Sequence, residues 1–86
     1  METPERRMPL VEAYVLLQTE QGRMAEIAQS LAQLPAVSEA DVVTGPYDVI
    51  ARVQADDMDA IGQLIVAEVQ NVGGVTRTLT CPVVHI

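Results

Sequence analysis

Aromatic residues and cysteine are scarce in this 86-residue chain, and lysine is absent. Two tyrosines are the whole aromatic content, so the core must be aliphatic. The single cysteine, Cys81, excludes an intrachain disulfide, and no Cys-x-x-Cys or Cys/His pattern typical of a metal site is present. A hydrophobic content of 49% excludes a disordered chain. These features predict a compact aliphatic domain of the cytoplasm that needs no metal or other cofactor.

Positively charged residues are also few. Five arginines against twelve acidic residues give a formal net charge of −7 at pH 7. Because nucleic acids are bound by clustered positive charge, we expect no direct contact with DNA or RNA. No apolar run approaches the roughly 18 residues of a membrane span, and the polar start of the sequence lacks the apolar stretch of a secretory signal. We therefore expect no membrane partner.

Hydrophobic periodicity divides residues 8–86 into six elements, after a polar lead-in at 1–7 that we expect to be flexible. Apolar runs typical of strands cover 8–18, 37–44, 47–55 and 75–86, and the three- and four-residue spacing of amphipathic helices covers 24–34 and 58–69. The order is βαββαβ. It fits one α+β domain with a ferredoxin-like sandwich fold, in which both helices cover the same face of an antiparallel sheet.

Glycine, proline and aspartate mark the boundaries between these elements. The Gly45-Pro46 pair predicts a chain reversal, because glycine accepts positive φ and proline holds φ at about −65°. Asp56-Asp57 predicts the start of the second helix, where carboxylates cap free N–H groups, and this role accounts for them without a metal. Gly73-Gly74 predicts the end of that helix. The turn at 19–22 offers cap residues for the first helix.

The first predicted strand is apolar on both faces. Val15 and its neighbours two residues away can face the helices, but Leu10, Tyr14 and Leu16 then point to the uncovered side. Each exposed side chain forgoes about 1.5–3 kcal/mol of burial, and a chain of this length has little core to compensate. Packing the sheets of two chains face to face would bury these exposed apolar side chains. We therefore predict a homodimer of the α/β-barrel type.

Polar side chains of possible functional interest follow the predicted turn. Tyr47 and Asp48 place an aromatic hydroxyl and a carboxylate beside the reversal, which is typical of a small ligand pocket. Turn aspartates more often accept backbone N–H groups, however, and a tyrosine at a strand start often covers the core, so these residues alone favour a structural role. Thr76, Thr78 and Thr80 share one face of the last strand, although threonine is common in strands.

Cys81 and His85 are the remaining residues of catalytic type. On one strand they would be about 13 Å apart, too far for a nucleophile and its base. We expect a buried thiol and a solvent-facing histidine.

Over roughly residues 8–86 the sequence resembles the effector-binding domain of Lrp/AsnC-type regulators. The resemblance rests on the element order, the passage Leu34-Pro35-Ala36-Val37, the hairpin Gly45-x-Tyr47-Asp48 and the final strand Val75-x-x-Thr78-x-Thr80. Such domains adopt a βαββαβ fold, pair through their sheets, assemble into rings and bind amino acids in clefts between subunits. The ligand-binding residues that the resemblance implies are Gly45, Tyr47, Asp48, Thr78 and Thr80.

Two departures from the family matter. Pro46 lacks the backbone N–H that the family commonly has at this position. Full-length members also carry an N-terminal helix-turn-helix domain, whereas seven polar residues precede the first predicted strand here. The resemblance therefore implies a stand-alone, non-enzymatic regulatory protein. It would bind an amino-acid effector and assemble with itself or with a full-length relative.

Two other functions stay open at this point. Small dimeric α/β-barrel enzymes, such as monooxygenases and isomerases, share this fold, and fold does not fix function. Those enzymes place polar groups in the sheet cavity, for which this chain offers Tyr14, Arg52 and His85. The third possibility is a purely structural assembly module with no ligand.

Overall fold

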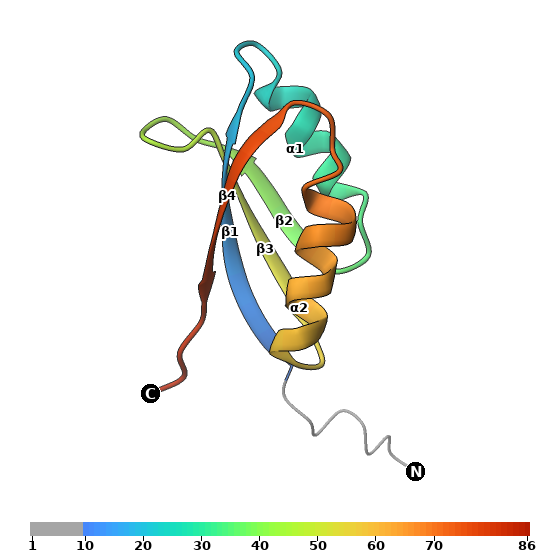
Figure 1. Cartoon of the computed structure of the whole chain (residues 1–86). Helices are drawn as coiled ribbons and strands as arrows, with labels where there is room; N and C mark the ends of the chain where they lie inside the picture. Colours follow the sequence, from blue (N-terminus) through green and yellow to red (C-terminus); the bar gives the residue numbers. More distant parts are fainter. Residues whose placement is uncertain (1–9) are drawn as a thin grey trace.

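The computed structural model describes residues 10–86 (Figure 1). The lead-in at 1–7 and the predicted strand start at residue 8 lie outside that range. In chain order the elements are β1 (Val11–Thr19), α1 (Met24–Ala32), β2 (Val37–Val42), β3 (Val49–Ala55), α2 (Met58–Leu64), its π-helical continuation η2 (Ile65–Val69), and β4 (Val75–Pro82). The predicted βαββαβ order is confirmed.

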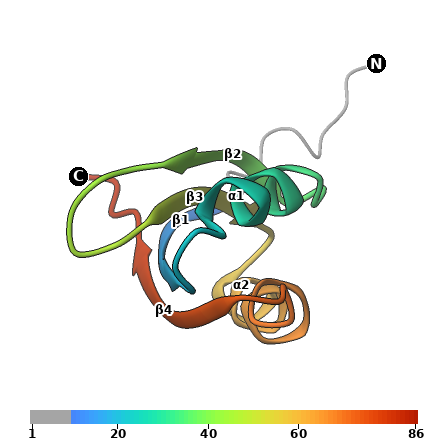
Figure 2. The same ribbon diagram turned by 90° about the horizontal axis from the view of Figure 1, so that it is seen from above.

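The four strands form one antiparallel sheet in the order β2-β3-β1-β4. α1 packs on β2 and β3, and α2 packs on β3 and β1, so both helices cover the same face (Figures 1 and 2). No described helix covers the other face, which we call the open face. This is the predicted ferredoxin-like α+β arrangement.

The core lies between the helices and the sheet and is wholly aliphatic among the described residues. β1 follows the predicted alternation, because Ala13, Val15 and Leu17 are fully buried while Tyr14 between them is exposed. The two-residue period of a strand sends these sets to opposite faces. The largest fully buried side chains are Leu17, Ile27, Leu31, Ile61, Val15, Val49, Val53 and Val69.

Some of the helix ends are as the sequence predicted, and one is not. Asp57 caps α2, because its Oδ1 accepts a hydrogen bond from the Ala60 N–H at 2.8 Å. Gly74 has a φ of +99°, as predicted for the chain after the second helix, and a Cβ there would lie 2.9 Å from Ile27 Cδ1. The predicted side-chain cap of α1 is wrong. Its N-cap residue is Arg23, which makes no capping hydrogen bond through its side chain.

Two strand boundaries also differ from the prediction. β3 begins at Val49, so Tyr47 and Asp48 lie in the loop before the strand rather than within it. β4 ends at Pro82, so His85 lies beyond the strand. The prediction of a buried thiol is wrong as well: Cys81 is exposed, because pairing with Tyr14 places it on the open face.

Replacing Asp57 with alanine is expected to lower the free energy of unfolding by about 1 kcal/mol, because the Ala60 N–H loses its acceptor at the helix start. Urea denaturation followed by circular dichroism measures the change. Asp56→Ala is the matched control, since Asp56 is also exposed but is not the N-cap residue. Equal destabilisation by both substitutions would contradict a capping role specific to Asp57.

Candidate functional site

The loop between β2 and β3 carries three of the predicted ligand-binding residues. It projects from the sheet on the side away from the helices (Figure 1). Its base is closed by the Val43 N–H, which donates to the Asp48 carbonyl at 2.9 Å. The Asp48 N–H in turn donates to the Leu17 carbonyl at 2.8 Å. The loop is therefore fixed to the end of β1 through its last residue.

The Asp48 carboxylate strengthens this connection. Its Oδ2 accepts hydrogen bonds from the backbone N–H of Thr19 at 2.8 Å and from Thr19 Oγ1 at 3.2 Å. These contacts are partly buried. Both bonds use the same oxygen, and within residues 10–86 the other oxygen, Oδ1, has no hydrogen-bond donor. Asp48 thus fills the structural role expected of a turn aspartate and keeps one acceptor open.

Gly45 and Tyr47 shape the rest of the loop. Gly45 has a φ of +140°, which favours glycine, and the space where a Cβ would sit is empty out to 4 Å. The carbonyl of Pro46 between them accepts a hydrogen bond from Gln18 Nε2 at 3.0 Å. Tyr47 is half-buried. The loop is anchored at two points and presents its glycine to solvent.

The two predicted threonines lie on the opposite side of β1, in the edge strand β4. Thr78 pairs with Leu17 and Thr80 pairs with Val15, so both face the helix layer and both are half-buried. Gln70, just after η2, donates from Nε2 to Thr78 Oγ1 at 3.2 Å. The threonines therefore border the end of the second helix rather than the open face.

Within one chain the five predicted residues form two groups. Leu17 pairs with Val49 on one side and with Thr78 on the other, so two strand spacings, about 10 Å, separate Val49 from Thr78. The fully buried side chain of Leu17 occupies the row between them. Within residues 10–86 of one chain, no single cavity therefore joins Asp48 to the threonines.

A small polar pocket of about 290 Å³ opens beside Thr78. Sequence reasoning missed two of its residues, Gln70 and Arg77, because neither belongs to a motif. The residues that line the pocket are Gln70, Val75, Thr76, Arg77 and Thr78.

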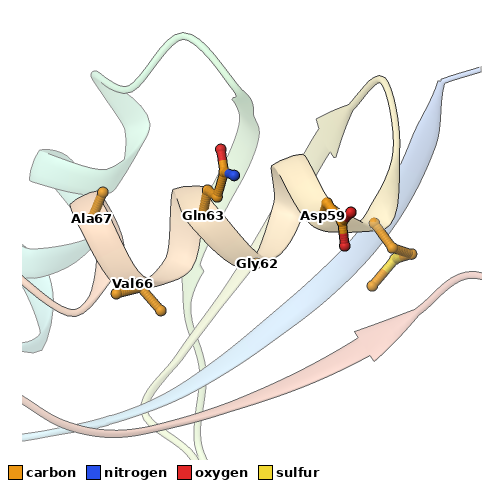
Figure 3. Close-up of a pocket in the computed structure, with 6 residues that line it drawn as sticks. Asp59, Gly62, Gln63, Val66 and Ala67 are labelled. Atoms are coloured by element: carbon orange, nitrogen blue, oxygen red, sulfur yellow. The ribbon is translucent and has the colours of Figure 1, made fainter.

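A larger and mostly apolar depression follows the outer surface of α2 and η2 (Figure 3). It contains none of the predicted ligand-binding residues. Its lining residues are Met58, Asp59, Gly62, Gln63, Val66 and Ala67.

The polar residues that an enzyme with this fold would use lie apart from both the loop and the two threonines. On the open face Arg52 Nη2 pairs with Glu12 Oε1 at 2.8 Å, and Arg52 Nη1 donates to the Tyr14 hydroxyl. The guanidinium also lies over the Tyr14 ring, 5.1 Å from its centroid. His85 is exposed beyond β4. Arg52 is thus engaged with both Tyr14 and Glu12, and His85 lies outside the sheet.

Comparison with known proteins identifies the family. The family model for the Lrp/AsnC ligand binding domain matches residues 12–86. The chain belongs to this family. A solved structure of a Thermus thermophilus protein is 30% identical, covers 88% of this chain and 95% of its own, and superposes with a TM-score of 0.82.

Regulators of transcription are among the relatives of this Lrp/AsnC domain. An uncharacterised HTH-type transcriptional regulator of Pyrococcus furiosus is 29% identical over 55 residues, which are 64% of this chain and 37% of the relative. The matched segment thus spans well under half the length of this relative. A Neisseria meningitidis transcriptional regulator, solved in complex with L-Met, shares the fold with a TM-score of 0.82 at 20% identity, over 99% of this chain and 56% of its own.

Within residues 10–86, no helix of the Lrp/AsnC domain is long and apolar enough to cross a membrane.

Proposed function

We propose that this Lrp/AsnC domain is a non-enzymatic regulatory module that binds an amino acid in a cleft between two copies of the chain. The observation that carries the proposal is the Asp48 carboxylate, which is held in place through Oδ2 while Oδ1 is open. A fixed carboxylate with a free acceptor suits the α-ammonium group of an amino acid, because a charge-assisted hydrogen bond orients the ligand. The L-Met complex of the Neisseria meningitidis regulator supports this ligand class.

The remaining ligand-binding residues have complementary roles in this proposal. Gly45 allows the loop backbone to approach the ligand closely. Thr78 and Thr80 donate hydroxyl groups to the ligand carboxylate, and Tyr47 covers its side chain. Because the threonines face the helix layer and lie on the other side of β1 from the loop, the loop of one copy meets the threonines of another where sheet-to-sheet dimers join into the ring that the family resemblance implies. The site is incomplete without the second copy.

The open face supplies a reason for two copies to associate. Leu16 pairs with Ile50 in β3 and with Leu79 in β4, so three aliphatic side chains form one row across the middle of this face. Leu79 is 43% exposed. Packing a second sheet against this row removes apolar surface from water, which favours a homodimer.

A full-length regulator is a further proposed partner. The curated relatives carry more than the segment that aligns with this chain, since that segment is 37% of the Pyrococcus furiosus regulator. An open face shared by two such proteins would allow mixed dimers, through which an effector bound here changes the assembly of the regulator. In this proposal the regulator, and not this chain, contacts DNA, in keeping with the net charge of −7.

The amino-acid site is tested with Asp48→Asn, which keeps the shape of the side chain and removes its charge. Each of the twenty amino acids is screened by thermal shift. A ligand present at about 100 times its Kd stabilises the fold by roughly 2.7 kcal/mol, which is several degrees in a domain of this size. We expect the wild type to show this shift with at least one amino acid and the variant to lose it.

Asp41→Asn is the matched control, because Asp41 is an exposed carboxylate in β2 outside the proposed site. It should keep the full ligand-induced shift. The proposal fails if Asp48→Asn melts at a lower temperature without ligand yet keeps the full shift with it. That result would leave Asp48 as a hairpin anchor alone.

A further inference from the structure

The open face carries opposite charges at the two edges of the sheet. In the edge strand β2, Asp41 pairs with Ile50, which in turn pairs with Leu16. In the other edge strand, β4, Arg77 pairs with Gln18, two residues beyond Leu16 in β1. Residues that pair directly in an antiparallel sheet share a face, as do residues two apart in one strand. The carboxylate and the guanidinium therefore both lie on the open face.

These edge charges are not balanced within one chain. The other two arginines of the described range, Arg23 and Arg52, form ion pairs with glutamates. Within residues 10–86, Arg77 and Asp41 have no partner of opposite charge. Both are exposed, and so is Glu39, two residues before Asp41 in β2. Three strand spacings, about 14 Å, separate β2 from β4, so the edge charges of one copy do not reach each other.

The edge charges distinguish two ways of packing a second sheet on the open face. If the two-fold axis runs across the strands, β2 lies over the partner's β2 and like charges meet. If the axis runs along the strands, β4 lies over the partner's β2 and opposite charges meet. The aliphatic row in the middle of the face can pack in both arrangements. Because juxtaposed like charges disfavour association, the charges favour the axis along the strands.

We propose that the sheet-to-sheet homodimer is oriented by an ion pair between Arg77 of each copy and the partner's Asp41, formed twice in the dimer. Asp41 lies in the same row as Leu79. Arg77 is two residues from Leu79, about 7 Å along β4, an offset that a long arginine side chain can span. A guanidinium suits this role because it binds a carboxylate through two parallel hydrogen bonds.

The inference rests on the homodimer of the proposed function and specifies which edges of the two sheets meet. It also states the chemistry of the partner that the open face accepts. That partner is a second copy of the chain, or a related sheet, with an aliphatic middle row and an acidic edge strand opposite Arg77. A sheet with a basic edge at that place would be rejected, since like charges would face each other.

The experiment reverses the charges one at a time and then together. The dissociation constant of the dimer is measured by sedimentation equilibrium, and circular dichroism verifies that each variant is folded. Arg77→Glu should weaken the dimer by about tenfold or more, because a carboxylate then faces the partner's acidic edge twice in each dimer. Asp41→Arg should have a similar effect. The double variant Arg77→Glu/Asp41→Arg restores the pair with its charges exchanged, and its dissociation constant should return to within about threefold of the wild type.

The controls separate pairing from net charge. Glu68→Arg makes the same charge change as Asp41→Arg on the outer surface of the second helix, and it should leave the dissociation constant unchanged. Arg77→Glu/Glu68→Arg has the same net charge as the restored double variant but should stay as weak as Arg77→Glu. Asp41→Asn removes attraction without adding repulsion, so it should remain a dimer at micromolar concentration.

The outcomes separate the ion pair from the proposed function. An unchanged dissociation constant in Arg77→Glu, or a double variant that is no tighter than the single variants, overturns the ion pair while amino-acid binding stands. If the double variant is restored but no amino acid shifts the melting temperature of the wild type, the ion pair stands and the amino-acid function fails. A wild type that is monomeric at micromolar concentration overturns both.

Discussion

Replacing Leu17 with alanine is expected to lower the free energy of unfolding by about 2–5 kcal/mol, a large share of the stability of a small domain. The side chain is 0% exposed and lies near the end of the interior strand β1, between β3 and β4. Truncation removes buried methyl groups and leaves a cavity that the neighbouring strands cannot close. Urea unfolding monitored by circular dichroism measures the effect.

Leu10→Ala is the matched control, because it removes the same atoms from a side chain that is 42% exposed. Its cost should stay below about 1 kcal/mol. Similar costs for the two substitutions would mean that Leu17 is not enclosed as the structure describes.

Leu17 also connects the core to the proposed site. Its carbonyl accepts the Asp48 N–H, and its strand neighbours are Val49 and Thr78. The loop and the threonine strand are therefore both positioned by the same residue of β1. Ligand affinity should fall in Leu17→Ala even at temperatures where the variant remains folded, since small misplacements of the two halves weaken charge-assisted contacts.

Local chemistry explains why most of the fold was predictable from the sequence. The alternation of β1 follows from the two-residue period of strands, and the buried set is the one that faces the helices. Asp57 was predicted at the start of α2, because a helix start needs acceptors for its free N–H groups. Gly74 was predicted after that helix, where the backbone takes a positive φ. Each of these signals lies within a few residues of the feature it specifies.

Features that depend on distant residues were not predictable in this way. The end of the loop is set by Asp48 and Thr19, which are 29 residues apart, so the late start of β3 has no local signal. Cys81 was expected to be buried, but its exposure follows from pairing with Tyr14 on the open face. The π-helical turn before Gln70, whose end residues Ile65 and Val69 are both buried, was likewise not predicted, because hydrophobic periodicity does not distinguish it from an α-helix.

The candidate site was likewise predictable from the sequence only in part. The resemblance to the family pointed to Asp48 and Thr78, and the structure places each in a hydrogen-bonded position. It gave no indication of Gln70, because its proximity to Thr78 arises only when the end of the second helix lies beside the edge strand. The separation of the loop from the threonines by β1 was also invisible in the sequence, and it is the reason for proposing a site shared by two copies.

Replacing Leu79 with glutamate is expected to convert the proposed dimer into monomers. Leu79 lies at one end of the aliphatic row on the open face and is 43% exposed in the single chain. Its replacement should therefore leave the fold of each chain intact. In a face-to-face pair, however, each copy would bury an unpaired carboxylate, and the desolvation of each costs several kcal/mol. Light scattering at micromolar concentration measures the molecular mass.

Val66→Glu provides the control, because it introduces the same charge on the outer surface of the second helix, at a residue that is 65% exposed. The wild type and Val66→Glu should both have the mass of a dimer or a larger assembly, and Leu79→Glu should have the mass of one chain. A monomeric wild type would remove the basis for a site shared between copies. Dissociation by Val66→Glu alone would instead place the interface on the helix layer. In that case the sheet-to-sheet dimer would be wrong.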